Sequence, residues 1–163
     1  GNVRTLCLQA AAGAPTPQAA SAIRYAFARL GAGYSNSRRN SVKPLLYDCS
    51  SYVGRAYNAG GAVIYNTKTR TKTRFYATFG FTGSYTPSNY AYTNLVRVTK
   101  AQLRPGDIII GFNGSLPVGG NAEHARMYIG NGNVIQEHNP SEVTPYYQYY
   151  THEWYFRYTQ PKG

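Results

Sequence analysis

One short segment constrains this chain most, because it places a cysteine at what reads as the first turn of a helix. The segment spans residues 47–53 and has the sequence Tyr-Asp-Cys-Ser-Ser-Tyr-Val. Asp48 is a good N-cap residue, and Tyr52 and Ala56 share one helical face. The unpaired N–H groups and the positive end of the dipole at a helix start favour a thiolate over a thiol. We therefore expect Cys49 to be a nucleophile rather than a buried structural cysteine.

A histidine lies far downstream, in the segment 124–136 with the sequence His-Ala-Arg-Met-Tyr-Ile-Gly-Asn-Gly-Asn-Val-Ile-Gln. The Gly-Asn-Gly-Asn stretch predicts a tight hairpin, because Gly and Asn tolerate positive φ. A tight register would bring Gln136 near His124, with His138 on the same strand face as Gln136. A helix-start cysteine and a distant histidine are typical of a Cys–His hydrolase, in which a third polar group orients the imidazole. Gln136 is our prediction for that group, and His138 stays open as the alternative.

Periodicity and turn residues predict helices first and strands afterwards. Thr16 caps a helix that begins at Pro17 and ends at Gly31. The segments that read as strands are 95–98, 108–112, 124–129, 134–138 and 154–158. We predict an α+β domain whose N-terminal helices pack on an antiparallel sheet of about five or six strands, in which roughly four to six strands form a meander. Residues 1–15 read as a leader of uncertain structure and residues 16–163 as a single domain.

The chain is strongly basic, with a formal net charge of +11 over 163 residues. Such a surface favours polyanions, although charge alone does not choose among them. The run 66–74 alternates Asn or Thr with Lys or Arg, so neither face of a strand there is apolar. We expect a solvated hairpin or loop, and the sharper interpretation is an arm that grips an anionic polymer. The next aromatic residues either line a groove or wrap the core: Phe75, Tyr76, Phe79, Phe81, Tyr85, Tyr90 and Tyr92.

Several classes of protein and site are disfavoured by the sequence. No stretch is long and apolar enough to span a bilayer, and no secretory signal is visible. No close Cys and His pair has the spacing of metal ligands, so we expect no metal and no cofactor. Cys7 lies in the leader, and we expect it to stay unpaired with Cys49.

Four ordered segments resemble the NlpC/P60 family of bacterial cell-wall cysteine peptidases, which have a papain-like fold. They are 28–34 (Ala-Arg-Leu-Gly-Ala-Gly-Tyr), 48–53 (Asp-Cys-Ser-Ser-Tyr-Val), 103–108 (Leu-Arg-Pro-Gly-Asp-Ile) and 124–136. The resemblance implies that Cys49 is the nucleophile, His124 the base and Gln136 the third catalytic residue. It implies further that three residues contact the substrate: Tyr34, Asp48 and Ser50.

By the same resemblance, the expected activity is that of a cysteine endopeptidase or amidase that hydrolyses peptide stems of bacterial peptidoglycan. The expected setting is extracellular, at the cell wall or in a phage virion, as for a lysin. We expect a monomer with anionic cell-wall polymers as further partners, and neither nucleic-acid binding nor membrane insertion. The alternatives are a CHAP-type amidase, with the same Cys–His–polar layout, and a catalytically silent module that binds cell wall or polyanions.

The sequence also departs from the family pattern. Ser51 stands where the family has a glycine, and Arg126 stands where it has a small residue on the histidine strand. The side chain of Arg126 must therefore find room beside the site. These departures bear on which bond is cleaved more than on the type of reaction.

Overall fold

The structure is a computed structural model that describes residues 1–86 and 93–162. Within these residues the helices are α1 (Asn2–Ala12), α2 (Pro17–Ala28), α3 (Cys49–Ala59) and α4 (Phe75–Thr78), with 3-10 turns η1 (Thr82–Ser84), η2 (Lys100–Gln102) and η3 (Gly119–Asn121). The strands are β1 (Gly33–Tyr34), β2 (Leu46–Tyr47), β3 (Val63–Asn66), β4 (Thr71–Arg74), β5 (Leu95–Val98), β6 (Ile108–Phe112), β7 (Ala122–Gly130), β8 (Asn133–Glu137), β9 (Ser141–Pro145) and β10 (His152–Tyr158). The predicted α+β class, with helices preceding an antiparallel sheet, is confirmed.

The central sheet has six strands in the order β5-β10-β6-β7-β8-β9, and all neighbours are antiparallel. Strands β6 to β9 form a meander of four strands, at the lower end of the predicted four to six. The C-terminal strand β10 inserts between β5 and β6. The apolar strand β6 is buried along its whole length, so it lies centrally and pairs on both edges, with β7 and with β10.

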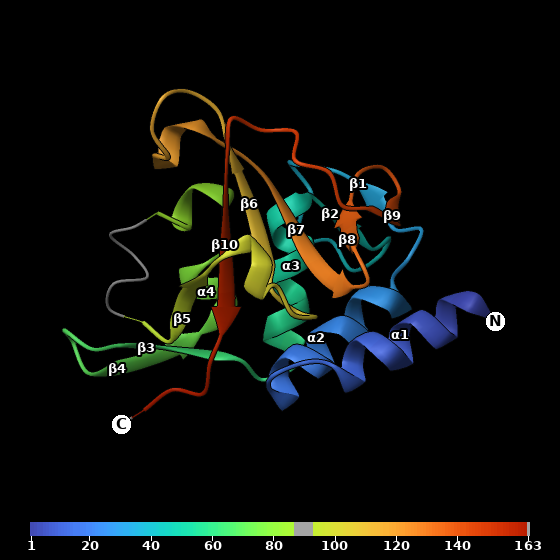
Figure 1. Cartoon of the computed structure of the whole chain (residues 1–163), viewed down its shortest axis with the longest axis horizontal. Coiled ribbons are helices and arrows are strands. Elements are labelled where there is room, and N and C mark those ends of the chain that lie inside the picture. Colours follow the sequence, from blue (N-terminus) through green and yellow to red (C-terminus); the bar gives the residue numbers. More distant parts are fainter. Residues whose placement is uncertain (87–92, 163) are drawn as a thin grey trace.

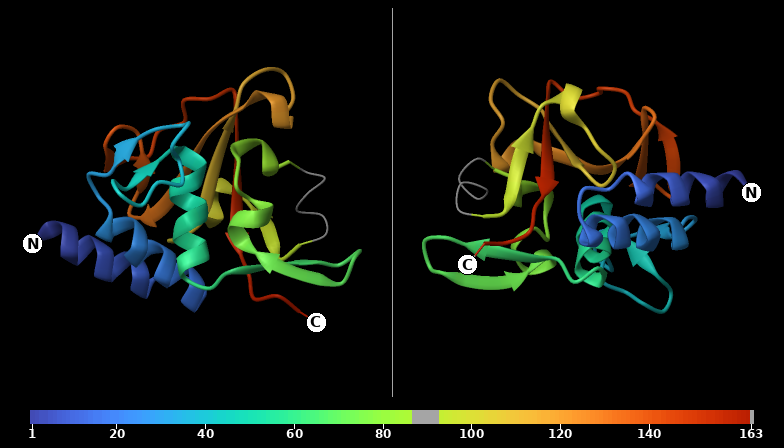
Figure 2. Two further views of the ribbon diagram at one scale, coloured as in Figure 1. Left: turned by 180° about the vertical axis from the view of Figure 1, so that it is seen from behind. Right: turned by 60° about the horizontal axis from the view of Figure 1, so that its bottom comes forward.

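The helices cover one face of this sheet, where α2 packs on α1 and α3, and α3 packs on β7 and β8 (Figure 1, Figure 2). Thr16 caps α2 as predicted, since its side chain accepts a hydrogen bond from the Ala19 N–H. The strand alternation predicted for β7 is also confirmed, because Ala125 and Met127 belong to the core cluster shared with the helices, whereas Arg126 between them pairs with Glu153. No helix among the described residues is long and apolar enough to cross a membrane.

The first 15 residues, for which the sequence predicts no definite structure, contain a helix. Helix α1 runs over Asn2–Ala12 and buries Ala10 against the rest of the chain. Cys7 lies on this helix and is partly buried, and both Cys7 and Cys49 are free thiols. The division into a leader 1–15 and a domain 16–163 stays a prediction.

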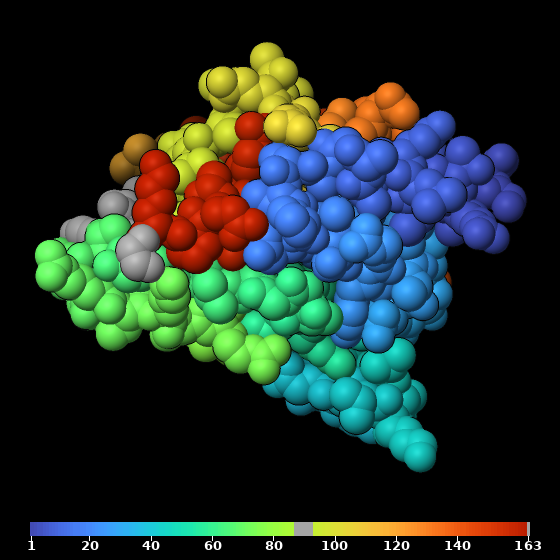
Figure 3. Space-filling model, turned by 90° about the horizontal axis from the view of Figure 1, so that it is seen from below, coloured from blue at the N-terminus to red at the C-terminus, as the bar shows by residue number. Residues whose placement is uncertain are grey.

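The basic run forms a hairpin of β3 and β4 at the end of the molecule away from α1 (Figure 1, Figure 3). Every residue of β4 is exposed, as expected for a strand without an apolar face. The aromatic residues that follow mostly wrap the core, since Phe75, Phe79 and Tyr85 are fully buried. The predictions for Tyr90 and Tyr92 lie outside the described residues.

Candidate active site

The start of α3 is fixed by its own sequence, and it holds Cys49 as the first helical residue. Asp48 is the N-cap: its Oδ1 accepts a hydrogen bond from the Ser51 N–H at 2.9 Å. Ser51 returns the contact, because its hydroxyl accepts from the Asp48 N–H at 2.8 Å. This capping box explains why serine suits the position where the family has glycine, and it sets the direction in which Cys49 points.

His124 and Gln136 come together across the β7–β8 hairpin. The His124 Nε2 lies 2.7 Å from the Gln136 Oε1. The amide nitrogen of Gln136 donates to the Thr144 hydroxyl on β9 at 2.8 Å, which fixes the orientation of the amide. The alternative orienter, His138, lies instead at the exposed rim, where its Nδ1 is 3.2 Å from a Glu142 carboxylate oxygen.

Cys49 approaches the residues next to His124 from the face of β7 that helix α3 covers. The backbone N–H groups of Ala125, next to His124, and of Ser50 lie near its sulfur and favour the thiolate form. The Thr82 hydroxyl of η1 lies 3.7 Å from the sulfur and covers it, and Cys49 is only 9% exposed. Among the described residues no hydrogen bond joins the sulfur to the imidazole. The structure therefore places the Cys49 sulfur near the residue that follows His124, without a hydrogen bond between the sulfur and the imidazole.

Burial decides the resting charges of both groups. It raises the pKa of the Cys49 thiol, and the hydrogen bonds from Thr82 and Ala125 oppose this only in part. Burial likewise lowers the pKa of His124 from its usual 6.5; the bond to Gln136 opposes this, and the charge of Arg126 adds to it. Both shifts favour the neutral forms, a thiol and an imidazole, over the expected thiolate, because desolvation outweighs the helix start.

The polar residues next to Cys49 are occupied by an arginine that sequence patterns do not single out. The Arg39 Nε lies 2.7 Å from the Asp48 Oδ2, and its Nη2 donates to the Ser50 hydroxyl at 2.8 Å. The guanidinium also donates to the Gly80 carbonyl and lies 4.3 Å from the centroid of the Phe81 ring. Asp48 and Ser50 are therefore buried beneath Arg39.

Tyr34 lies open at the rim of the same region. It is 41% exposed. Its phenol has a raised pKa, chiefly from partial burial and then from the negative charges that Cys49 and Asp48 carry when ionised. Of the three residues expected to contact substrate, Tyr34 is thus the one available to solvent.

A groove of about 570 Å³ opens on the imidazole side of the site. His124 and Gln136 form one end, and Tyr147, Tyr149 and Tyr150 line a wall. The Tyr150 ring lies 6.3 Å from the His124 ring, centroid to centroid. No local sequence signal marks this wall, because the tyrosines follow β9 in a segment without regular structure.

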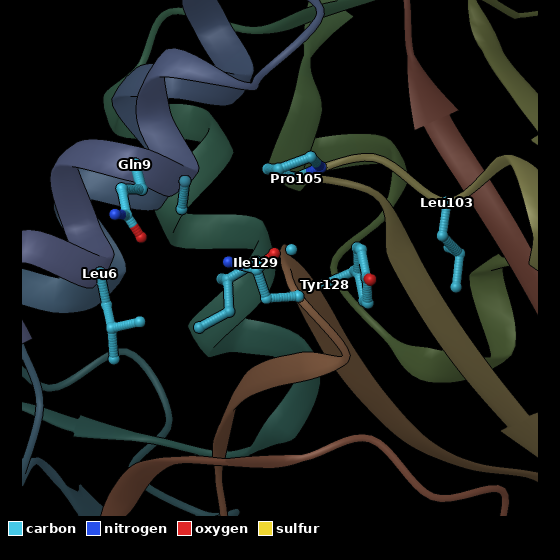
Figure 4. Close-up of a pocket in the computed structure, with 9 residues that line it drawn as sticks. Leu6, Gln9, Leu103, Pro105, Tyr128 and Ile129 are labelled. Atoms are coloured by element: carbon cyan, nitrogen blue, oxygen red, sulfur yellow. The ribbon is translucent and has the colours of Figure 1, made fainter.

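Another cavity, of about 300 Å³, lies between α1 and the β7 end of the sheet (Figure 4). Leu6 and Gln9 of α1 face Pro105, Tyr128 and Ile129 across it. It contains neither Cys49 nor His124. Among the described residues, no group of three or more His, Cys, Asp or Glu side chains is arranged to hold a metal ion.

Comparisons with known proteins agree with this fold. The P60 domain of a Mycobacterium avium subspecies paratuberculosis antigen has a similar fold, with a TM-score of 0.58, 18% identity, and coverage of 86% of this chain and 93% of that one. NlpC1 from Trichomonas vaginalis matches with a TM-score of 0.56 and 21% identity over 88% of this chain. This chain spans only 44% of the length of NlpC1 and 46% of that of NlpC2 from the same organism.

A search of curated proteins gives no match. The sequence profile of the NlpC/P60 family, in contrast, matches residues 24–162, which is most of the chain and includes every candidate residue above. With the helix-start cysteine, the histidine strand and the six-stranded sheet in place, this chain belongs to the NlpC/P60 family, whose members are generally cysteine peptidases and include peptidoglycan hydrolases.

Proposed function

We propose that this chain is a cysteine endopeptidase or amidase that hydrolyses the peptide stems of bacterial peptidoglycan. Cys49 is the nucleophile, His124 the general base and acid, and Gln136 the residue that orients the imidazole. The observation that carries the proposal is the 2.7 Å contact between His124 and Gln136, beside the strand position that lies near the Cys49 sulfur.

The contact with Gln136 selects one tautomer of His124. The Gln136 amide nitrogen is engaged by Thr144, so its oxygen faces the imidazole and only accepts. The Nε2 atom of His124 must then carry the proton, which leaves Nδ1 as the basic nitrogen. A base with its free nitrogen defined in this way is what a neutral thiol needs for deprotonation.

The reaction follows from these neutral resting states. As the sulfur attacks the carbonyl carbon of the scissile amide, its proton passes to Nδ1 of His124. The C–N bond then breaks, the imidazolium gives that proton to the leaving amine, and a thioester remains on Cys49. Water, deprotonated by the same imidazole, attacks the thioester; it releases the acid and restores the thiol. Backbone N–H groups at the start of α3 stabilise the oxyanion in both steps.

Substrate contact on the nucleophile side falls first to Tyr34, because it is exposed. Contact with Asp48 or Ser50 requires Arg39 to leave its present position, since that guanidinium engages both side chains. We propose that a stem peptide meets Tyr34 and Arg39 before it meets Asp48 and Ser50.

The setting that suits this activity is the cell wall, reached from outside the cell or as part of a phage virion. The exposed basic hairpin of β3 and β4 is proposed to contact anionic wall polymers, and the chain to act as a monomer. Charge supports this partner, because four basic side chains lie on or next to an exposed strand: Lys68, Arg70, Lys72 and Arg74.

The direct experiment is digestion of purified peptidoglycan by the wild-type chain and by Cys49→Ala, with mass spectrometry of the released fragments. We expect the substitution to abolish release while thermal unfolding stays cooperative, and Cys7→Ala to keep full activity as the matched thiol control. The fragment masses also distinguish an endopeptidase, which cuts within the stem, from an amidase, which cuts between sugar and peptide. Undiminished digestion by Cys49→Ala would refute the proposed function.

A further inference from the structure

The Cys49 sulfur is closed off from the groove that reaches His124. Of the described residues, those that line this groove include His124 but not Cys49, which is only 9% exposed. The Thr82 hydroxyl lies 3.7 Å from the sulfur and covers it. A scissile carbonyl carbon must come to about 3–3.5 Å from a nucleophile before a bond forms. A substrate that reaches the imidazole in this structure therefore does not reach the sulfur, and the cover has to move first.

The cover is a turn that is held in the core at both ends and exposed in between. Phe79 and Tyr85 are fully buried, with their ring centroids 4.9 Å apart. Between them Phe81 is 63% exposed, and residues 82–84 are half-buried. Segments that bury few apolar side chains open locally without unfolding the rest of a chain. The turn over Cys49 can thus move while the two buried rings stay in place.

One side chain ties this turn to the start of the nucleophile helix. The Arg39 guanidinium donates to the Gly80 carbonyl and lies 4.3 Å from the centroid of the Phe81 ring. It also engages α3, where its Nε lies 2.7 Å from the Asp48 Oδ2 and its Nη2 donates to the Ser50 hydroxyl at 2.8 Å. Its side chain is 12% exposed, so water and salt weaken these charge-assisted contacts little. Arg39 therefore bridges the two segments that meet at the sulfur.

The backbone of Arg39 is itself fixed from α3. The Arg55 Nη1 donates to the Arg39 carbonyl at 2.9 Å and to the Leu46 carbonyl at 2.8 Å. The Arg55 guanidinium lies 4.0 Å from the centroid of the Tyr47 ring, which holds it in place. Because α3 carries both this support and Cys49, the guanidinium of Arg39 keeps a defined position relative to the sulfur.

Resting on the proposed function only for the role of Cys49 as nucleophile, we propose that Arg39 is a positioning residue that holds the turn 80–82 closed over the sulfur. Release of the guanidinium from the turn uncovers Cys49 for the substrate. The open state is then a minor population of the resting chain, at about 10% or less, and catalysis begins with the opening of the turn. The nature of the bond that is cleaved does not enter.

The test is the rate at which N-ethylmaleimide, a neutral thiol reagent, modifies Cys49 in a Cys7→Ala background. Arg39→Lys keeps the charge beside Asp48, but a single ammonium group lacks the planar fork that spans both segments. We expect it to raise the rate by about tenfold, the change from a minor open state to a fully open one. Arg38→Lys, at the exposed neighbouring position, should leave the rate unchanged.

A second variant removes both charges and keeps the helix start. Arg39→Gln with Asp48→Asn leaves no buried charge unpaired, and asparagine is as good an N-cap residue as aspartate. The double variant should show the same rise in rate. Hydrogen exchange should become faster in the turn 80–84 and stay unchanged in α3, whereas a general loss of stability would speed exchange in both.

A third variant pair tests the cover itself. Thr82→Val keeps the bulk over the sulfur and should not raise the rate, because it removes only a hydrogen bond that favours the thiolate. Thr82→Ala removes the bulk and should raise the rate several-fold, because burial is the main cause that keeps the thiol neutral.

Unchanged rates in both Arg39→Lys and the double variant would overturn the inference, as would equal rates in Thr82→Val and Thr82→Ala. Either result would leave the proposed function intact if hydrolysis still depends on Cys49. Full digestion of peptidoglycan by Cys49→Ala would refute the proposed function, whereas the maleimide rates would still decide whether Arg39 holds the cover closed.

Discussion

The two sides of the candidate site are built differently. On the nucleophile side, Asp48 and Ser50 are buried, capped and engaged by Arg39, and the Cys49 sulfur is covered by Thr82. On the imidazole side, His124 ends an open groove whose wall of tyrosines is held from behind by Arg126. The first side is closed and polar, and the second is open and aromatic.

This contrast indicates that the two sides of the site have different roles. Contacts local in sequence fix the nucleophile, because the capping box lies within residues 48–51. The tyrosine wall of the groove depends on a buried ion pair that joins β7 to the C-terminal strand, with Arg126 and Glu153 far apart in sequence. Changes to Arg126 and the tyrosines that it holds should therefore alter substrate binding and stability, whereas changes at Cys49, His124 or Gln136 should alter the chemical step.

The largest effect is expected where the imidazole side is braced. Arg126→Met leaves the Glu153 carboxylate buried without its cation, which should lower the free energy of unfolding by about 3–5 kcal/mol. The double variant Arg126→Met with Glu153→Gln should recover much of that loss, because no unpaired charge remains. Urea unfolding measures both. A loss below about 1 kcal/mol in the single variant would mean that the pair does not brace the wall.

Next in size is the effect of the orienting residue on the chemical step. Gln136→Leu removes the acceptor that holds the proton on Nε2 of His124, and should lower kcat about 100-fold, the lower end of what general acid–base catalysis contributes. Thr144→Val keeps the acceptor and should cost much less. Steady-state kinetics on a stem peptide give both values, and an unchanged kcat in Gln136→Leu would remove Gln136 from the catalytic unit.

The pH dependence of activity should show the lowered pKa of His124. The base must be neutral to accept the thiol proton, and burial lowers its pKa below 6.5, with Arg126 and His138 adding to the shift. The acid limb of kcat/KM against pH should therefore fall below pH 6.5. A limb above that value would show that another group controls the proton transfer.

A smaller effect, on stability alone, is expected from Glu137 on the helix-facing side of β8. Burial raises its pKa from 4.5 to about 8, and the backbone N–H of Asn139 opposes this shift only in part. The folded state thus binds the proton more tightly than the unfolded state, so stability is full below pH 4.5 and is lost as pH rises towards 8. Glu137→Gln should flatten this fall in denaturant unfolding, and the exposed control Glu123→Gln should not. Parallel pH curves for wild type and Glu137→Gln would contradict the assignment.

The smallest effect is expected from the basic hairpin, far from both sides of the site. Replacing Lys68, Arg70, Lys72 and Arg74 by glutamine should weaken binding to whole cell walls several-fold and flatten its dependence on salt. Hydrolysis of a short stem peptide should stay unchanged. A sedimentation assay at increasing salt measures the binding, and an unchanged salt profile would leave the hairpin as a solvated loop.

Sequence patterns predicted the parts of the site that rest on local signals. The start of α3, the buried strand β6 and the hairpin that brings Gln136 to His124 all follow from caps, apolar runs and turn residues. Sequence patterns could not place β10 between β5 and β6, because strand order depends on contacts between distant segments. Strand β9 was not predicted because its polar sequence has no apolar pattern. The direction of the Cys49 pKa shift was not predicted either, because burial is a property of the folded chain.

The central claim is that Cys49 and His124 act as one unit. The most direct measurement is the rate of Cys49 alkylation by iodoacetamide across pH, in a Cys7→Ala background, with and without His124→Ala. The account predicts that loss of the imidazole slows alkylation at neutral pH by about tenfold or more and moves its rise to higher pH, because a buried thiol without its base ionises late. Identical pH profiles for the two proteins would contradict it.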